Sequence, residues 1–92
     1  MYRTFIYVRS VNLKLNVEGN KKNIIGPRLR EARIFNSLTQ KQLSSRLDMV
    51  AIYIDRAGIS KIEHQQRIVT DFELVTLAGV LNVTPNWLLS GE

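Results

Sequence analysis

The spacing of hydrophobic residues changes near residue 24 and divides the chain into two regions. Between Arg9 and Glu18, hydrophobic and polar residues alternate one by one, which is the period of a β-strand. After residue 24, hydrophobic residues recur every three or four positions, as in amphipathic helices. The pattern therefore predicts an N-terminal extension over residues 1–23 and a helical domain over residues 24–92.

The extension leaves three structural alternatives open. A lone strand cannot bury its hydrophobic side, so it must pair with a second copy of the chain, lie on the helical domain, or be disordered. A short polar stretch, Gly19–Asn23, follows it and is typical of a turn or linker. The extension is therefore described as strand-like or disordered.

The helical region contains signals for five helices. Residues that favour helix starts precede or open each of them: Pro27, Thr39, Asp55, Thr70 and Thr84. Gln42 and Glu73 stand three positions after a threonine, which predicts two capping boxes. Gly91 is a suitable end for the last helix. These signals predict an all-α domain.

The helical period also predicts which side chains face the core. The expected inner positions are Ile25, Leu29, Ala32, Phe35, Leu43, Leu47, Ile59, Ile62, Phe72, Leu74, Leu77, Ala78 and Leu81. In the third helix this leaves Ser60 and Lys61 on the outer side. A side chain at these positions would be able to contact a partner.

Composition restricts the functional classes. The 92 residues suffice for one small core, and the absence of cysteine excludes disulfides and thiolate metal sites. The hydrophobic runs are too short for a membrane span or a convincing signal peptide, which favours a cytoplasmic protein. His64 is the only histidine, and no carboxylate pair or glycine-rich phosphate loop is evident. We therefore expect no enzyme, no metal and no cofactor.

The charge is distributed unevenly. The net charge is +5, and residues 1–36 carry eight Lys and Arg against two acidic residues, a local charge of +6. Residues 37–92 carry five basic and six acidic residues, a local charge of −1. A basic half favours an anionic partner, although a solvated face that maintains solubility would have the same composition.

Four segments together resemble the lambda-repressor-like, Cro-type (XRE family) helix-turn-helix domains. They are Ile25–Arg33 (IGPRLREAR), Leu38–Leu43 (LTQKQL), Ile59–Glu63 (ISKIE) and Leu81–Leu89 (LNVTPNWLL). The resemblance spans residues 25–91, about three-quarters of the chain. It implies a five-helix domain in which the third helix, after Asp55, contacts double-stranded DNA. It also implies that the protein is a homodimer that binds a palindromic operator.

One segment departs from this family. Its members usually join the second and third helices by a turn of only a few residues. Here Asp48–Ile54 lies between them. Either a longer second helix or a hydrophobic loop that packs Ile52 or Ile54 on the core would accommodate the additional residues.

The resemblance also implies roles for individual residues. Gln40 matches a phosphate contact, Arg56 a base reader whose alternative is a phosphate contact, and Arg67 a phosphate donor in a loop. Arg33 and Glu63 match a structural pair that holds the first helix to the third and directs the arginine toward the DNA backbone. The implied DNA-contacting residues are Arg33, Gln40, Lys41, Arg56, Ala57, Ser60, Lys61 and Arg67.

Ala57 is suited to a thymine methyl group, whereas Gly58 offers no side chain to a base. We therefore expect modest direct base readout and a larger contribution from backbone contacts and DNA shape.

Three functions fit these observations. The first is a sequence-specific DNA-binding transcriptional regulator, a small dimeric repressor. The second is an antitoxin-like protein that binds DNA with residues 24–92 and a protein partner with residues 1–23, since an extended segment can add a strand to a partner. The third is a protein-interaction module that does not bind DNA, suggested by the Asp48–Ile54 segment and the Ala57-Gly58 pair.

Overall fold

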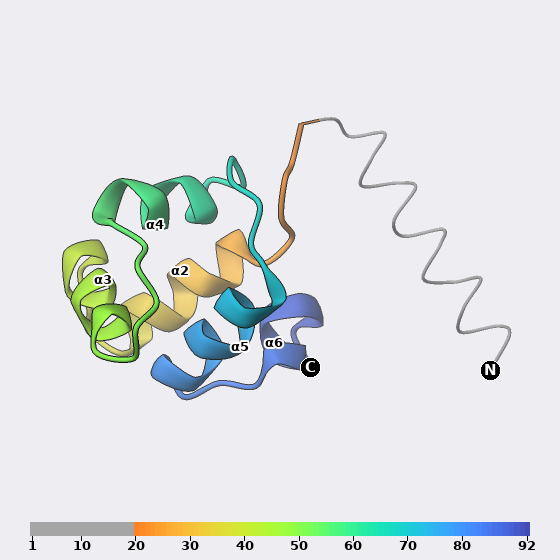
Figure 1. The fold of residues 1–92 in the computed structure, drawn as a ribbon. Helices are drawn as coiled ribbons and strands as arrows, with labels where there is room; N and C mark the ends of the chain where they lie inside the picture. Colours follow the sequence, from red (N-terminus) through yellow and green to blue (C-terminus); the bar gives the residue numbers. More distant parts are fainter. Residues whose placement is uncertain (1–19) are drawn as a thin grey trace, which may run out of the picture.

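Five helices form the part of the chain that the computed structural model describes, residues 20–92 (Figure 1). They are α2 (Gly26–Phe35), α3 (Gln40–Asp48), α4 (Arg56–Glu63), α5 (Asp71–Val80) and α6 (Pro85–Ser90). Within these residues there is no strand, so the expected five-helix, all-α architecture is confirmed. The alternating stretch between Arg9 and Glu18 lies outside the described residues.

The helices begin where the capping residues predicted. The Thr39 hydroxyl accepts a hydrogen bond from the Gln42 backbone N–H at 3.0 Å, and the Gln42 side chain accepts one from the Thr39 N–H at 2.8 Å. Thr70 and Glu73 form the same reciprocal pair at the start of α5. Each box satisfies N–H groups that a helix start would otherwise leave without a partner.

Helix α2 passes through the middle of the domain, with α4 on one side and α6 on the other (Figure 1). The core between the helices is almost entirely aliphatic; its fully buried large side chains are Leu29, Leu43, Leu47, Ile59, Ile62, Leu77, Leu81 and Leu88. A Cβ on Gly26 would lie only 2.4 Å from the carbonyl oxygen of Ile62. Glycine at this position therefore allows the start of α2 to lie against the end of α4.

Two of the expected core positions are wrong. Phe35 is 88% exposed and Phe72 is 78% exposed. At 100° per residue, Phe35 lies about 120° around α2 from Leu29, and Phe72 lies about 140° around α5 from Leu77. Both side chains therefore fall outside the buried stripe of their helix, and their hydrophobic character alone was misleading.

After Asp48, which ends α3, the rest of the Asp48–Ile54 segment is a loop whose last part packs on the core. Helix α3 ends at Asp48, and Ile54 is only 3% exposed while Ile52 packs against the core. The Ser44 hydroxyl donates a 2.6 Å hydrogen bond to the Ile54 carbonyl oxygen and fixes the end of the loop to α3. The second of the two sequence-based explanations is therefore confirmed, and α4 starts from a defined position.

Candidate nucleic-acid interface

Helix α4 has a buried side and an exposed side. Ile59, Ile62 and Glu63 are buried against the domain, whereas Arg56, Ala57 and Lys61 are exposed and Ser60 is half-buried. The helix starts at the Asp55 cap, whose Oδ1 accepts the Gly58 N–H at 2.7 Å. In Figure 1, α4 lies along one edge of the molecule, so its outer side faces solvent. This arrangement presents the first turns of α4 to a partner.

The start of α3 lies beside α4. Gln40 opens α3 and donates from its side-chain amide to Glu63 Oε1 at 3.1 Å. An amide nitrogen carries two N–H donors, so this bond leaves Gln40 a second one. Lys41 follows and is exposed. Two predicted DNA-contacting residues therefore lie in the first turn of α3, and the first of them, Gln40, is hydrogen-bonded to the last residue of α4.

A buried ion pair sets the orientation of these helices. Arg33 Nε donates to Glu63 Oε2 at 2.6 Å and Arg33 Nη2 donates to Oε1 at 3.1 Å, with side chains only 11% and 2% exposed. Arg33 Nη1 also donates to the Leu38 carbonyl oxygen at 2.8 Å. The expected Arg33–Glu63 pair is therefore present and is more buried than a surface pair. Together with Gln40, it joins α2, α3 and α4 at one carboxylate.

Arg67 lies in an ion pair that the sequence had not indicated. Its Nη1 and Nη2 donate to Glu73 Oε1 and Oε2, each at 3.0 Å. This hydrogen bonding is the main reason that the pKa of Glu73 is lowered and the pKa of Arg67 is raised. The sequence showed Glu73 only as a member of a capping box. The phosphate contact of Arg67 stays a prediction, and much of its charge is compensated within the protein.

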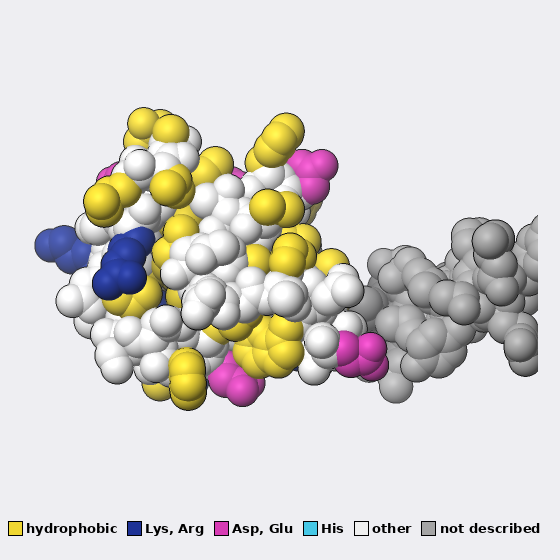
Figure 2. Space-filling view, turned by 90° about the horizontal axis from the view of Figure 1, so that it is seen from below, with side chains coloured by type: hydrophobic (Ala, Val, Ile, Leu, Met, Phe, Trp, Pro, Cys, Tyr) yellow, Lys and Arg dark blue, Asp and Glu magenta, His cyan; other side chains and the backbone are white. Residues whose placement is uncertain are grey.

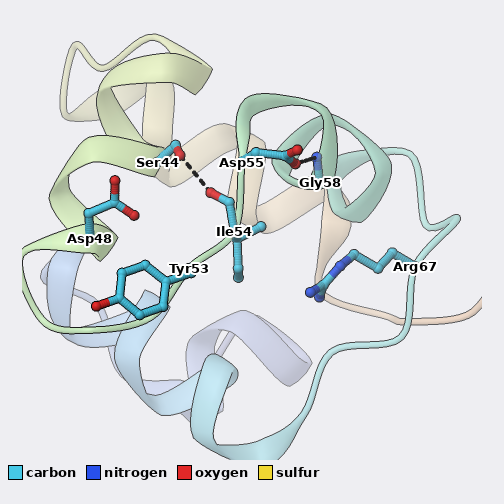
Figure 3. A pocket seen from close by; sticks show the side chains of 7 residues that line it. All are labelled: Ser44, Asp48, Tyr53, Ile54, Asp55, Gly58 and Arg67. Atoms are coloured by element: carbon cyan, nitrogen blue, oxygen red, sulfur yellow. Dashed lines mark hydrogen bonds between the residues drawn. The ribbon is translucent and has the colours of Figure 1, made fainter.

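Gly58 lies in the first turn of α4, where the space around its Cα is tight (Figure 3). A Cβ at this position would lie 2.8 Å from Ile54 Cγ2 and 3.0 Å from Asp55 Oδ1. The recess drawn in Figure 3 is lined by Ser44, Asp48, Tyr53, Ile54, Asp55, Gly58 and Arg67. Gly58 therefore has a packing role, because it allows the Asp48–Ile54 segment to approach α4.

The face opposite α4 has a different composition. Seen from below, this face displays many hydrophobic side chains, and Lys and Arg side chains appear only near one edge (Figure 2). The exposed hydrophobic residues of the described chain include Phe72, Val75, Met49 and Tyr53. The hydrophobic face is thus suited to a hydrophobic protein surface, whereas the exposed side of α4, which carries Arg56 and Lys61, is suited to an anionic partner.

Metal and membrane sites are not indicated by the described residues. No group of three or more His, Asp or Glu there could hold a metal ion. His64 is exposed at the end of α4, with its Nδ1 2.8 Å from the Ser60 carbonyl oxygen. None of the helices in residues 20–92 has the length and hydrophobicity that crossing a membrane requires.

The described fold is that of a known family. A family model described as a helix-turn-helix domain matches residues 26–92, so the chain belongs to this family. Among solved structures, it is similar to the P22 c2 repressor protein in complex with a synthetic operator, with a TM-score of 0.65 and 23% sequence identity. That match covers 76% of this chain and 98% of the repressor chain. No curated protein sequence shows a significant similarity to this chain.

Proposed function

We propose that this protein is a sequence-specific, DNA-binding transcriptional regulator that acts as a small dimeric repressor. The observation that carries the proposal is the geometry of α4. Its inner side is fixed by Ile59, Ile62 and the Glu63 carboxylate, while Arg56, Ala57 and Lys61 remain exposed on its outer side. A rigid helix with exposed first turns is what entry into the major groove requires. The similarity to the operator-bound P22 c2 repressor supports the same function.

Two kinds of contact would hold the DNA. Gln40 and Lys41, at the positive end of α3, would donate to phosphates and position the protein. Arg56 opens α4, and its planar guanidinium suits the O6 and N7 atoms of guanine. Ala57 would contact a thymine methyl group. Because few polar side chains reach the bases, DNA shape would supply much of the specificity.

The observations that favoured a module without DNA binding have structural explanations. The Asp48–Ile54 segment packs Ile54 into the core, and Gly58 is required by the close approach of that segment. Neither feature removes the outer side of α4 from solvent. Both are therefore compatible with DNA binding.

Dimerisation is supported by the outward side of α5. Phe72, Val75, Thr76 and Gly79 lie on one side of this helix, and the two hydrophobic members are 78% and 59% exposed. A second copy of the chain would bury them, and the operator of such a dimer is expected to have half-sites one helical turn, about 34 Å, apart. Sedimentation should then show a dimer that Phe72→Asp converts to a monomer. A wild-type monomer at every concentration, also with DNA, would contradict dimerisation.

DNA binding is tested by a salt titration with mixed-sequence duplex DNA. Each neutralised phosphate should contribute a slope of about −0.9 to the plot of log affinity against log salt. We expect a slope of several units for the full chain. A flat titration, or no binding at low salt, would contradict the proposal and favour the protein-interaction module.

Base reading by Arg56 is tested on a sequence recovered from a genomic DNA pull-down. Arg56→Ala should cost about 1–3 kcal/mol of binding and relax specificity at one base pair. An equal loss on every DNA sequence would instead assign Arg56 to a phosphate.

A protein partner for residues 1–23, as in the antitoxin-like alternative, stays a prediction. Deleting residues 1–19 tests it, because residues 22 and 23 are bonded to the helical domain. Loss of a co-purifying protein with unchanged DNA affinity would favour that alternative.

A further inference from the structure

Residues 22 and 23 are hydrogen-bonded to the end of α4 and to the loop that follows it. The Lys22 backbone N–H donates to the Gln65 carbonyl oxygen at 2.9 Å, and the Gln65 side-chain amide donates to the Asn23 carbonyl oxygen at 3.0 Å. The Asn23 amide donates to the carbonyl oxygens of Ile62 at 3.1 Å and Arg67 at 2.8 Å. The backbone at residue 22 is therefore held at a defined place beside the end of α4.

Asn23 serves both ends of this connection. While its amide nitrogen binds the α4–α5 loop, its Oδ1 accepts the Gly26 N–H at 2.9 Å at the start of α2. An asparagine supplies donor and acceptor from one rigid group, which a carboxylate or an aliphatic side chain cannot do. Asn23 therefore clamps the residues that precede α2 onto the helix that would read DNA.

This clamp places Lys22 next to the exposed side of α4. Lys22 lines a recess with Ala57, Lys61, Gln66 and Arg67, as well as Asp55, Gly58 and Ile68. The recess is lined by three basic residues and one acidic residue, Asp55, whose carboxylate already caps α4. Arg67 is paired with Glu73, so the two exposed lysines supply most of the attraction for an anion.

We propose that Lys22 is a phosphate-contacting residue of the DNA interface and that Asn23 is its positioning residue. The proposal rests on the proposed function and adds a contact from outside the helix-turn-helix motif. When the first turns of α4 enter the groove, the adjacent DNA backbone lies over the recess between Lys22 and Lys61. Lys22 then binds a phosphate as a point charge and contributes affinity without sequence preference.

The test compares Lys22→Ala with Arg46→Ala in the full chain, using mixed-sequence duplex DNA at several salt concentrations. Arg46 is exposed in the last turn of α3, at the opposite end of that helix from Gln40, so it controls for the loss of one positive charge. Lys22→Ala should make the salt slope shallower by about 0.9, whereas Arg46→Ala should leave it near the wild-type value. Equal slopes for Lys22→Ala and the wild type would overturn the proposal, as would equal changes in both variants.

Asn23→Ala provides a second readout, after thermal unfolding has established that the variant is folded at the assay temperature. Asn23→Ala should make the slope of log affinity against log salt shallower by the same amount as Lys22→Ala does. The double variant should have the same slope as either single variant. Additive losses would overturn the positioning role of Asn23. Lys22→Ala leaves the clamp intact, so it tests the contact even where Asn23→Ala unfolds. A flat salt slope for the wild-type chain would refute the proposed function itself, whereas a steep wild-type slope that Lys22→Ala leaves unchanged would overturn only the role of Lys22.

Discussion

At the scale of single residues, the Glu63 carboxylate connects the helices of the candidate interface. It accepts two hydrogen bonds from Arg33 and one from Gln40, and it is almost fully buried. These three residues belong to α2, α3 and α4. The carboxylate therefore fixes the last turn of α4 relative to the first turn of α3. These two helices are the elements that would contact DNA.

Breaking this pair should be costly. Arg33→Met leaves the Glu63 charge buried without its partner, so we expect the free energy of unfolding to fall by about 3–5 kcal/mol. Urea unfolding followed by circular dichroism measures this change. The double variant Arg33→Met, Glu63→Leu should recover much of the loss, because it removes both buried charges. A loss below about 1 kcal/mol for the single variant would contradict a buried pair.

Glu73 should make the stability depend on pH in acid. Its pKa is lowered, first by the hydrogen bonds from Arg67, so the folded state holds its proton less tightly than the unfolded state does. The stabilisation is thus complete above the unfolded-state pKa of about 4.3 and is lost as the pH falls through the lowered folded-state value. Glu73→Gln keeps an acceptor for the Thr70 N–H and should reduce the dependence of unfolding free energy on pH.

The measurement is a series of urea unfolding curves between neutral pH and about pH 3. Glu31→Gln, at an exposed position of α2, is the matched control and should follow the wild type. If Glu73→Gln and the wild type lose stability in parallel on acidification, the Arg67–Glu73 pair does not stabilise the fold.

Residue-level roles were only partly predictable from the sequence. The Arg33–Glu63 pair was found because it is part of a family pattern. The Arg67–Glu73 pair and the packing of Gly58 were missed, since both depend on how a loop approaches a helix in space. Phe35 and Phe72 were placed in the core on hydrophobicity, although their angular positions on the helices point away from it.

At the scale of elements, helix starts were predictable because capping is local chemistry. Thr39, Asp55, Thr70 and Thr84 each accept a hydrogen bond from the backbone N–H three residues further along the chain, which the sequence alone can indicate. The path of the Asp48–Ile54 segment could not be predicted in the same way. Its sequence was compatible both with a longer second helix and with a hydrophobic loop packed on the core. The contact of Ile54 with the core decided between them.

Two glycine substitutions separate local propensity from packing. At protein concentrations where the chain is monomeric, Gly79→Ala should stabilise α5 by up to about 1 kcal/mol, because its Cβ would meet nothing of the same chain within 4 Å and alanine favours a helix. Gly58→Ala has the same propensity gain but would push against Ile54 and Asp55, so we expect a net loss of about 1–3 kcal/mol. Thermal or urea unfolding of both variants measures the difference. Equal stabilisation by the two would show that the segment before α4 does not pack as described.

At the scale of the whole molecule, family and fold followed from four motifs in a fixed order, and the family model and the structure confirmed both. The difference in surface composition between the hydrophobic face in Figure 2 and the outer side of α4 could not be predicted from the sequence, because it depends on the packing of all five helices. The outcome for residues 1–19 lies outside the described part of the chain.

The central claim is that the exposed side of α4 meets double-stranded DNA. Titrating duplex DNA into the isotopically labelled full chain, with backbone amide chemical shifts as the readout, tests it most directly. We predict that the largest shifts occur from Asp55 to Lys61 and at Gln40 and Lys41, while α5 and α6 change little on DNA binding. Saturable binding with its shifts confined to α5 and α6, or no shifts at low salt, would contradict the account.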